Sequence, residues 1–249
     1  WVGLVTPLLA MLITGGVMYF MLEYAREHGT PNYRPFARSC YGEKLGGVVA
    51  VLYDICFLMT MMCAGGLAFS GEGKLLQGFL GVNYWATAII TILISAALCL
   101  YGSKLLAKSS GYLITILLMV CLIFTLFSYT NVFDVCAETL PVMSVLNRLG
   151  MKWLQWLYVI LMTLAVLTSA AGLAHAGNVR FDGLFRFIKN AQLRRFVITA
   201  ILLGIAAAGA ALGFQAMLQQ GTSIVGWAAI PIVVIPAFTI VASKVRKAK

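Results

Sequence analysis

The stretch VLYDICFLMTMMCAGG, residues 51–66, places one carboxylate, Asp54, inside an apolar run of helical length. The run belongs to a longer apolar segment at 46–70, which is long enough for a helix rising about 1.5 Å per residue to cross a hydrocarbon layer of roughly 30 Å. Counted from the start of that segment, Asp54 lies near the middle of the bilayer. An ionised aspartate costs roughly 2.5 to 3.5 kcal/mol there, so this acid needs a structural or functional explanation.

The composition extends this interpretation to the whole chain. Hydrophobic residues make up 61% of the 249 positions and charged residues 10%, and the mean hydropathy is +0.95. These values indicate an integral membrane protein, and the long apolar runs favour helices over the short alternating strands of a barrel. We predict an all-α polytopic transmembrane bundle forming a single domain over 1–249, with about seven spans: 1–25, 46–70, 84–101, 111–130, 153–174, 196–219 and 224–243.

The net charge of +10 reflects topology rather than nucleic-acid binding, because the basic residues alternate by loop. Three of the 18 lie in loops on one side, at Lys74, Arg148 and Lys152. The other 15 lie in the segments 26–45, 102–110, 175–195 and 244–249. The positive-inside rule makes these segments cytoplasmic, which puts the N-terminus of this chain outside and its C-terminus inside. A thiol reagent should then reach Cys40 only from the cytoplasm and Cys136 only from outside.

Catalytic and metal-binding patterns are missing from the sequence. The six cysteines form no CxxC pair, and the two histidines, His28 and His175, show no ligand spacing. A nucleophile elbow, a phosphate-binding glycine loop and carboxylates paired at helical spacing are likewise not found. We therefore expect neither an enzyme nor a metal site, and no cofactor apart from a coupling ion, H⁺ or Na⁺.

Asp54 is the candidate for an ion or substrate path. At helical spacing it shares a stripe with Phe57 and Met61, and glycines at both ends of the stripe favour a face that packs against other helices. The middle of each predicted span carries no Lys, Arg or His, so we predict no permanent positive partner for this acid. Two roles remain open: a neutral, hydrogen-bonded group that joins helices, or a site that alternately holds a proton or a cation.

A second candidate is the small-residue patch in LTSAAGLAHAG, residues 167–177, which follows bulkier residues and contains Ala170 and Ala171 beside the three polar or flexible positions Thr168, Ser169 and Gly172. Such a patch is typical of a tight helix crossing. It is also typical of a discontinuous helix whose freed backbone groups and hydroxyls line a binding site at mid-membrane. We predict that the three residues belong to the substrate or ion path if the second alternative holds.

Other interruptions are expected in the first and last spans. Gly15 and Gly16 could break the first helix, and Pro231 and Pro236 should kink the last one, because proline removes a backbone hydrogen bond. The motif GAALG, residues 209–213, is typical of plain helix packing.

The loops permit two further predictions. The segment 180–195 has the pattern of an amphipathic helix on the inner leaflet, although a basic loop that sets topology fits equally well. The segment 141–153 could form a short helix at the outer surface. The acids other than Asp54 are placed in loops or at span ends, Glu72 among them.

Three stretches resemble the YkvI-type family of bacterial membrane proteins: DICFLMTMMCAGGLAFSGEG, YGSKLLAKSSGYLITILL and WLYVILMTLAVLTSAAGLAHAG. The resemblance implies a place in the amino acid-polyamine-cation transporter superfamily, with the leucine-transporter fold of two inverted five-helix repeats, in the bacterial cytoplasmic membrane. The chain opens at Trp1 within an apolar segment, so we expect at least one further helix upstream. The seven spans would then be helices two to eight of that fold, with Asp54 in the third and the small-residue patch in the sixth. The fold's first, ninth and tenth helices have no counterpart here.

The function that follows from the resemblance is secondary transport of a small organic solute, an amino acid or related compound, coupled to H⁺ or Na⁺ by alternating access. The expected partners are the lipid bilayer and the solute, and no nucleic acid. The alternative is a membrane sensor or assembly subunit of the same fold that does not transport. A membrane-embedded enzyme is the least supported of the three.

Overall fold

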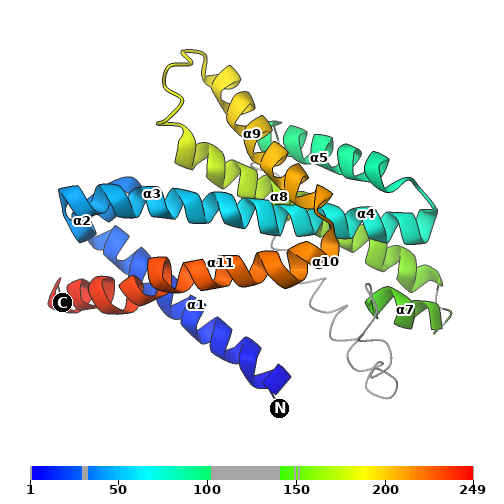
Figure 1. The fold of residues 1–249 in the computed structure, drawn as a ribbon, viewed down its shortest axis with the longest axis horizontal. Helices are drawn as coiled ribbons and strands as arrows, with labels where there is room; N and C mark the ends of the chain where they lie inside the picture. Colours follow the sequence, from blue (N-terminus) through cyan, green and yellow to red (C-terminus); the bar gives the residue numbers. More distant parts are fainter. Residues whose placement is uncertain (1, 30–32, 102–140, 149, 151, 249) are drawn as a thin grey trace. The chain divides into compact units, whose positions relative to one another are not determined.

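The computed structural model describes residues 2–29, 33–101, 141–148, 150 and 152–248. Regular structure in these ranges is helical throughout, which confirms the predicted all-α class (Figure 1). Five helical stretches are long and apolar enough to cross a membrane. They are Glu43–Leu80, Tyr84–Tyr101, Lys152–Phe181, Ala191–Ala211 and Phe214–Val245. The chain is therefore a membrane-embedded helical protein.

These five stretches coincide with five of the predicted spans, with shifted ends. The largest shift is in the span predicted at 46–70, which is a helical stretch of 38 residues, Glu43–Leu80. The span predicted at 1–25 is the helix α1, Val2–Glu27, although it is not one of the five. The span predicted at 111–130 lies outside the described residues. The seven-span arrangement and the leucine-transporter topology therefore remain predictions.

The described helices divide into two compact units. The first contains residues 1–60 and 220–249. Its elements are α1, α2 (Tyr33–Tyr41), α3 (Glu43–Thr60), α11 (Thr222–Ala229), the π-helical turns η3 (Ile230–Val234) and η4 (Ala237–Val241), and α12 (Ala242–Ala248). A buried cluster joins α1, α2 and the end of the chain, and its members are Tyr24, Phe36, Cys40, Val241 and Val245.

The expected interruptions in the first unit have different outcomes. The helix α1 is α-helical through both Gly15 and Gly16, which corrects the break expected there. Gly16 instead permits close packing, because a Cβ on it would lie 2.7 Å from Cζ of Phe238 on η4. Pro231 lies within η3 and Pro236 directly precedes η4. The absent proline N–H explains why the regular α-helical hydrogen bonding gives way to wider turns here.

The second unit contains residues 61–219. Its described elements are η1 (Met61–Gly65), α4 (Gly66–Leu80), α5 (Tyr84–Tyr101), α7 (Pro141–Arg148), α8 (Lys152–Phe181), α9 (Ala191–Ala211) and α10 (Phe214–Ala216), with η2 (Met217–Gly221) at the boundary between the units. The short helix α7 lies where one was expected. Leu75, Met143 and Val159 form a buried cluster that ties α4, α7 and α8 together.

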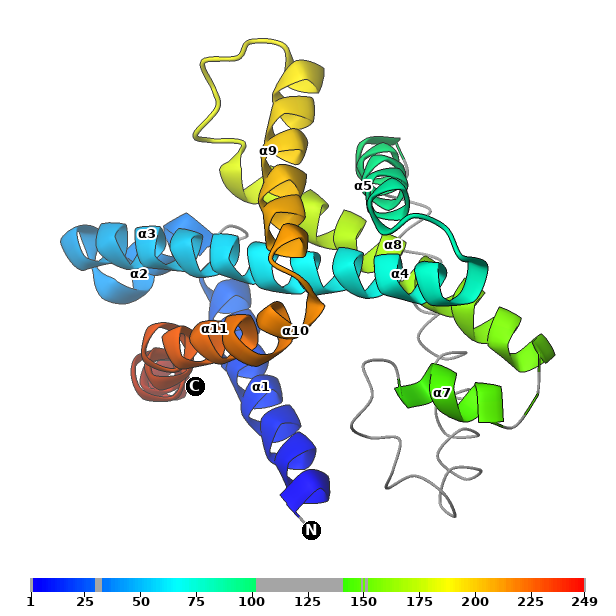
Figure 2. The same cartoon turned by 45° about the vertical axis from the view of Figure 1, so that its right-hand side comes forward.

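The helix α9 crosses η1 and α4 at a seam of small residues (Figure 2). A Cβ on Gly65 would lie 2.7 Å from Cβ of Ala206, and one on Gly66 would lie 2.8 Å from the backbone of Gly209. A Cβ on Gly209 would in turn overlap the backbone carbonyl oxygen of Met62. Gly209 thus has the packing role predicted for GAALG. Gly213 does not: its φ of +92° ends α9 and turns the chain into α10.

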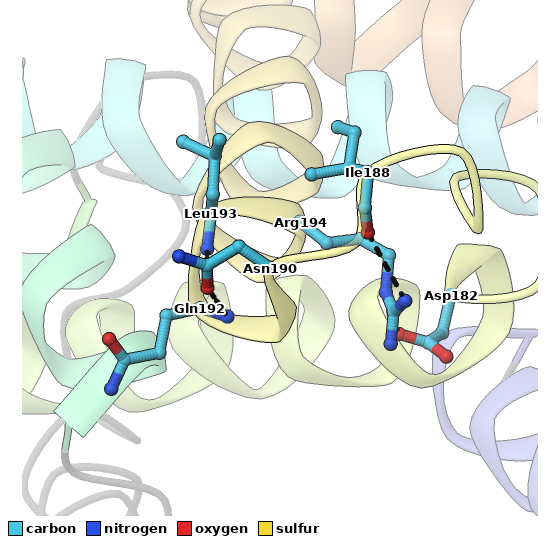
Figure 3. Close-up of polar contacts among 6 residues, drawn as sticks. All are labelled: Asp182, Ile188, Asn190, Gln192, Leu193 and Arg194. Carbon is cyan, nitrogen blue, oxygen red and sulfur yellow. Dashed lines mark hydrogen bonds and ion pairs between the residues drawn. The ribbon is translucent and has the colours of Figure 1, made fainter.

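Residues 182–190 connect α8 to α9 without a helix of their own, which corrects the amphipathic helix considered for 180–195. Asn190 caps α9, because its side chain accepts hydrogen bonds from the backbone N–H groups of Gln192 and Leu193 (Figure 3). Nε of Arg194 donates to Oδ1 of Asp182 at 2.6 Å, which ties the first turn of α9 to the end of α8.

Candidate functional site

The predicted site residue Asp54 lies on α3, at the base of a tight hairpin between α2 and α3. Gly42 joins the two helices with a φ of +81°, a conformation that glycine adopts without strain. Gly46 lets them approach closely, because a Cβ there would lie 2.5 Å from Cα of Arg38. The hairpin therefore places side chains of α2 beside the middle turns of α3.

Two side chains from the start of α2 contact the Asp54 carboxylate. Nη2 of Arg34 lies 2.9 Å from Oδ2 of Asp54, and Oη of Tyr33 donates a hydrogen bond to Oδ1. Nε of Arg34 also donates to Oη of Tyr33 at 2.9 Å, so the three side chains form a closed ring of contacts. Asp54 is buried, at 8% exposed. The prediction that this acid has no permanent positive partner is therefore wrong.

The arginine in this ring remains charged. Its hydrogen bond to Tyr33 and, to a lesser degree, its contact with Asp54 raise the pKa of Arg34, while partial burial opposes the rise. The sequence could not show this pairing, because Arg34 lies 20 residues away in a loop outside every predicted span. The geometry gives Asp54 a tethering role: it holds α2 against α3 through a carboxylate that is balanced within the chain.

The ion pair between Arg34 and Asp54 should contribute modestly to stability. The Arg34 side chain is 41% exposed, and pairs of that kind are typically worth about 0.2 to 1 kcal/mol because water screens them. In a double-mutant cycle of Arg34→Gln and Asp54→Asn, followed by unfolding in mixed micelles, we expect a coupling energy of about 0.5 kcal/mol. Arg38→Gln, at an exposed arginine of the same helix, is the matched control and should show no coupling to Asp54→Asn. If the effects of Arg34→Gln and Asp54→Asn on the free energy of unfolding were strictly additive, the ion pair would not hold α2 against α3.

The remaining predicted path residues lie in both units. Phe57 is half-buried on α3 of the first unit, whereas Met61 is fully buried in η1 of the second unit, at the seam with α9. Thr168, Ser169 and Gly172 also belong to the second unit, on α8. Asp54 and Phe57 thus belong to the first unit, and the other four residues belong to the second.

The small-residue patch lies within α8, and its continuous helix corrects the break considered there. The helix continues without a break from Lys152 to Phe181, and Oγ1 of Thr168 donates to the carbonyl oxygen of Leu164 at 2.9 Å within it. Ser169 and Gly172 are exposed, and a Cβ on Gly172 would meet nothing within 4 Å. Ala170 and Ala171 of the same patch are buried, together with Ala174, so one side of the patch is closely packed.

Sequence reasoning missed a second buried acid, Glu72, which was placed in a loop. Glu72 lies on α4 and is 2% exposed. Its Oε1 is 2.5 Å from Oγ1 of Thr163 on α8, and its Oε2 has no hydrogen-bond partner among the described residues. The sequence carried one signal for it: apolar residues continue at helical spacing beyond Glu72, at Leu75, Leu76, Phe79 and Leu80.

A third polar cluster joins α5, α8 and α9. Nδ2 of Asn178 donates to Oγ1 of Thr199 at 2.7 Å and contacts Sγ of Cys99 at 3.4 Å. Interhelical hydrogen bonds of this kind hold membrane helices together. Within the described ranges, no three His, Cys, Asp or Glu side chains gather closely enough to hold a metal ion.

Searches of family models, curated proteins and solved structures find no match to this chain. Function must therefore be argued from the membrane-spanning helices and their buried polar groups.

Proposed function

We propose that this chain is a secondary transporter of a small organic solute, coupled to a gradient of H⁺ or Na⁺ across the bacterial cytoplasmic membrane. One observation carries the proposal: a single membrane-spanning stretch, Glu43–Leu80, bears two buried carboxyl groups, Asp54 and Glu72. Acids within the bilayer are costly and most often mark ion or proton pathways.

The two acids have different roles in this proposal. Asp54 is matched by the Arg34 guanidinium, so it needs no ion from solution. Glu72 has one hydroxyl neighbour and one oxygen without a partner, so its charge is not matched by the described part of the chain. A group whose charge state can change is the kind that couples ion binding to a conformational equilibrium. The solute class, an amino acid or related compound, and the leucine-transporter fold rest on the family resemblance alone.

Gradient-driven accumulation tests this proposal. With the protein in liposomes, we expect at least one radiolabelled amino acid to accumulate above its external concentration under an imposed inward proton or sodium gradient. Accumulation should collapse when an ionophore dissipates that gradient. Liposomes of equal protein content without a gradient, and protein-free liposomes with one, are the controls. Binding without accumulation, for every amino acid and both gradients, would refute transport.

A non-transporting sensor or assembly subunit is the second candidate. The observation that favours it is the continuous helix α8, which lacks the break expected around Thr168 and Gly172 for a mid-membrane binding site. The same liposome experiment separates the two, because a sensor binds its ligand without accumulating it.

A further inference from the structure

The hydroxyl group of Thr163 on α8 lies within hydrogen-bonding distance of two oxygen atoms. Its Oγ1 lies 2.5 Å from Oε1 of Glu72 and 2.9 Å from the carbonyl oxygen of Val159. A threonine hydroxyl carries one hydrogen, and neither a carbonyl oxygen nor an ionised carboxylate has one to give. The Thr163 hydroxyl can donate to both oxygens only by sharing its single hydrogen between them. Two full hydrogen bonds form when Glu72 is a carboxylic acid that donates to Thr163, while Thr163 donates to Val159.

The burial of Glu72 also favours the protonated, neutral form of its carboxyl group. An ionised carboxylate has about four acceptor sites, and within the described part of the chain the Thr163 hydroxyl is the only donor to Glu72. The other oxygen, Oε2, is buried and has no hydrogen-bond partner in the described ranges, a situation that is much more costly for a charged group than for a neutral one. A neutral acid leaves one carbonyl oxygen unsatisfied, whereas an ion leaves an uncompensated charge.

Charged and titratable groups lie on α4 itself and on the elements that pack against it. Nζ of Lys74, on α4 itself, lies over the ring of Phe214 on α10, 5.7 Å from its centre. Oη of Tyr84 on α5 donates to the carbonyl oxygen of Ala210 on α9 at 3.2 Å. Cys63 on η1 is buried, and Tyr158 on α8 is half-buried. Among the described residues, Thr163 alone forms a hydrogen bond with the Glu72 carboxyl.

We infer that Glu72, with Thr163, is a proton-binding site at the contact between α4 and α8. Release of the proton turns the Thr163 hydroxyl hydrogen from the Val159 carbonyl to the carboxylate. It also leaves Oε2 in need of a donor that this arrangement does not supply. Proton release therefore destabilises the packing seen here and favours another arrangement of the two helices. The naming of H⁺ as the coupling ion rests on the proposed transport function, whereas the proton site itself does not.

Labelling with dicyclohexylcarbodiimide tests the site on the unmodified protein. The reagent adds across a protonated carboxylic acid in an apolar environment and forms an N-acylurea, which retains every atom of both reactants. In nanodiscs we expect mass spectrometry to find one adduct at Glu72, decreasing as the pH is raised, and none at Asp54. An unlabelled Glu72 at neutral and acidic pH would overturn the proposal. Labelling that sodium suppresses at fixed pH but that does not respond to pH would overturn it as well, in favour of a sodium site.

Infrared difference spectroscopy tests it a second way. The carbonyl stretch of a protonated acid should appear at neutral pH in wild type, vanish in Glu72→Gln and persist in the matched control Asp54→Asn. Thr163→Val, which removes the hydroxyl at nearly constant shape, should keep the band but shift its frequency. The same spectrum in wild type and Glu72→Gln would exclude Glu72 as the proton carrier.

Failure of this site and failure of transport are distinguishable. If the chain does not transport, both the adduct and the band persist although no solute accumulates. If it transports by a different coupling residue, Glu72→Gln retains accumulation driven by a proton gradient. If Glu72 is the coupling acid, Glu72→Gln loses that accumulation at least tenfold while solute exchange at equal concentrations continues.

Discussion

Replacing Gly209 by leucine is expected to prevent the second unit from folding. A Cβ at this position would overlap the backbone carbonyl oxygen of Met62, and the Cα of Gly66 lies on the same side at 3.3 Å. Neither obstacle is the flexible end of a side chain, so α9 and η1 would have to separate. Overpacking of this kind typically costs 1 to 3 kcal/mol, and we expect the upper end, about 3 kcal/mol, because the obstacle is backbone.

Gly172→Leu on α8 is the matched control, since it makes the same change where nothing lies within 4 Å. Thermal unfolding in detergent, with size-exclusion profiles, should show wild-type behaviour for Gly172→Leu and aggregation or a strongly lowered midpoint for Gly209→Leu. Equal thermal unfolding midpoints for the two variants would contradict the close packing of α9 against η1 at Gly209.

Single cysteines in two exposed loops are expected to be labelled from opposite sides of the membrane. Val82→Cys, between α4 and α5, should react with an impermeant maleimide only from outside, and Gly183→Cys, between α8 and α9, only from the cytoplasm. The expectation follows from the distribution of 15 against 3 basic residues among alternate loops. Both variants are built on a Cys136→Ser background, and labelling is measured on intact cells and on inverted vesicles.

The native Cys40 cannot serve for this test, although the sequence had suggested it. Its side chain is 3% exposed, and burial raises the pKa of its thiol, so little of the reactive thiolate exists at neutral pH. It should therefore give a low background in both experiments. Labelling of Val82→Cys and Gly183→Cys from the same side would disprove the predicted orientation.

Helix positions could be predicted because apolar length follows directly from the thickness of a bilayer. The span expected at 84–101 is the helix Tyr84–Tyr101. The last two spans were less accurate, because the turn between them lies at Leu212 and Gly213 rather than near residue 220. The long apolar pattern hid this turn, which depends on the positive φ of a single glycine.

The candidate sites were harder to predict because they depend on contacts between distant segments. Glu72 was assigned to a loop because it lies just beyond the span predicted at 46–70, where Gly71 and Gly73 flank it. The structure gives these glycines a packing role: a Cβ on Gly73 would lie 2.7 Å from the ring of Tyr84, and one on Gly71 would lie 3.2 Å from that of Phe214. The hydrophobic pattern of a sequence identifies the apolar face of a helix. It does not identify the aromatic ring from a distant segment that packs against a glycine on that helix.

The contact between Glu72 and Thr163 also has a consequence for biosynthesis. The two residues are 91 positions apart, so at about 5 to 20 residues per second the acid leaves the ribosome roughly 5 to 20 s before its partner. During that interval the nascent helix must accommodate Glu72 alone. Its 38 residues extend for roughly 57 Å, well beyond the roughly 30 Å of hydrocarbon, and Glu72 lies only about 12 Å from the end at Leu80. Because the helix is longer than the bilayer is thick, Glu72 can lie at the headgroup level until α8 is inserted. A helix of minimal spanning length would not allow this.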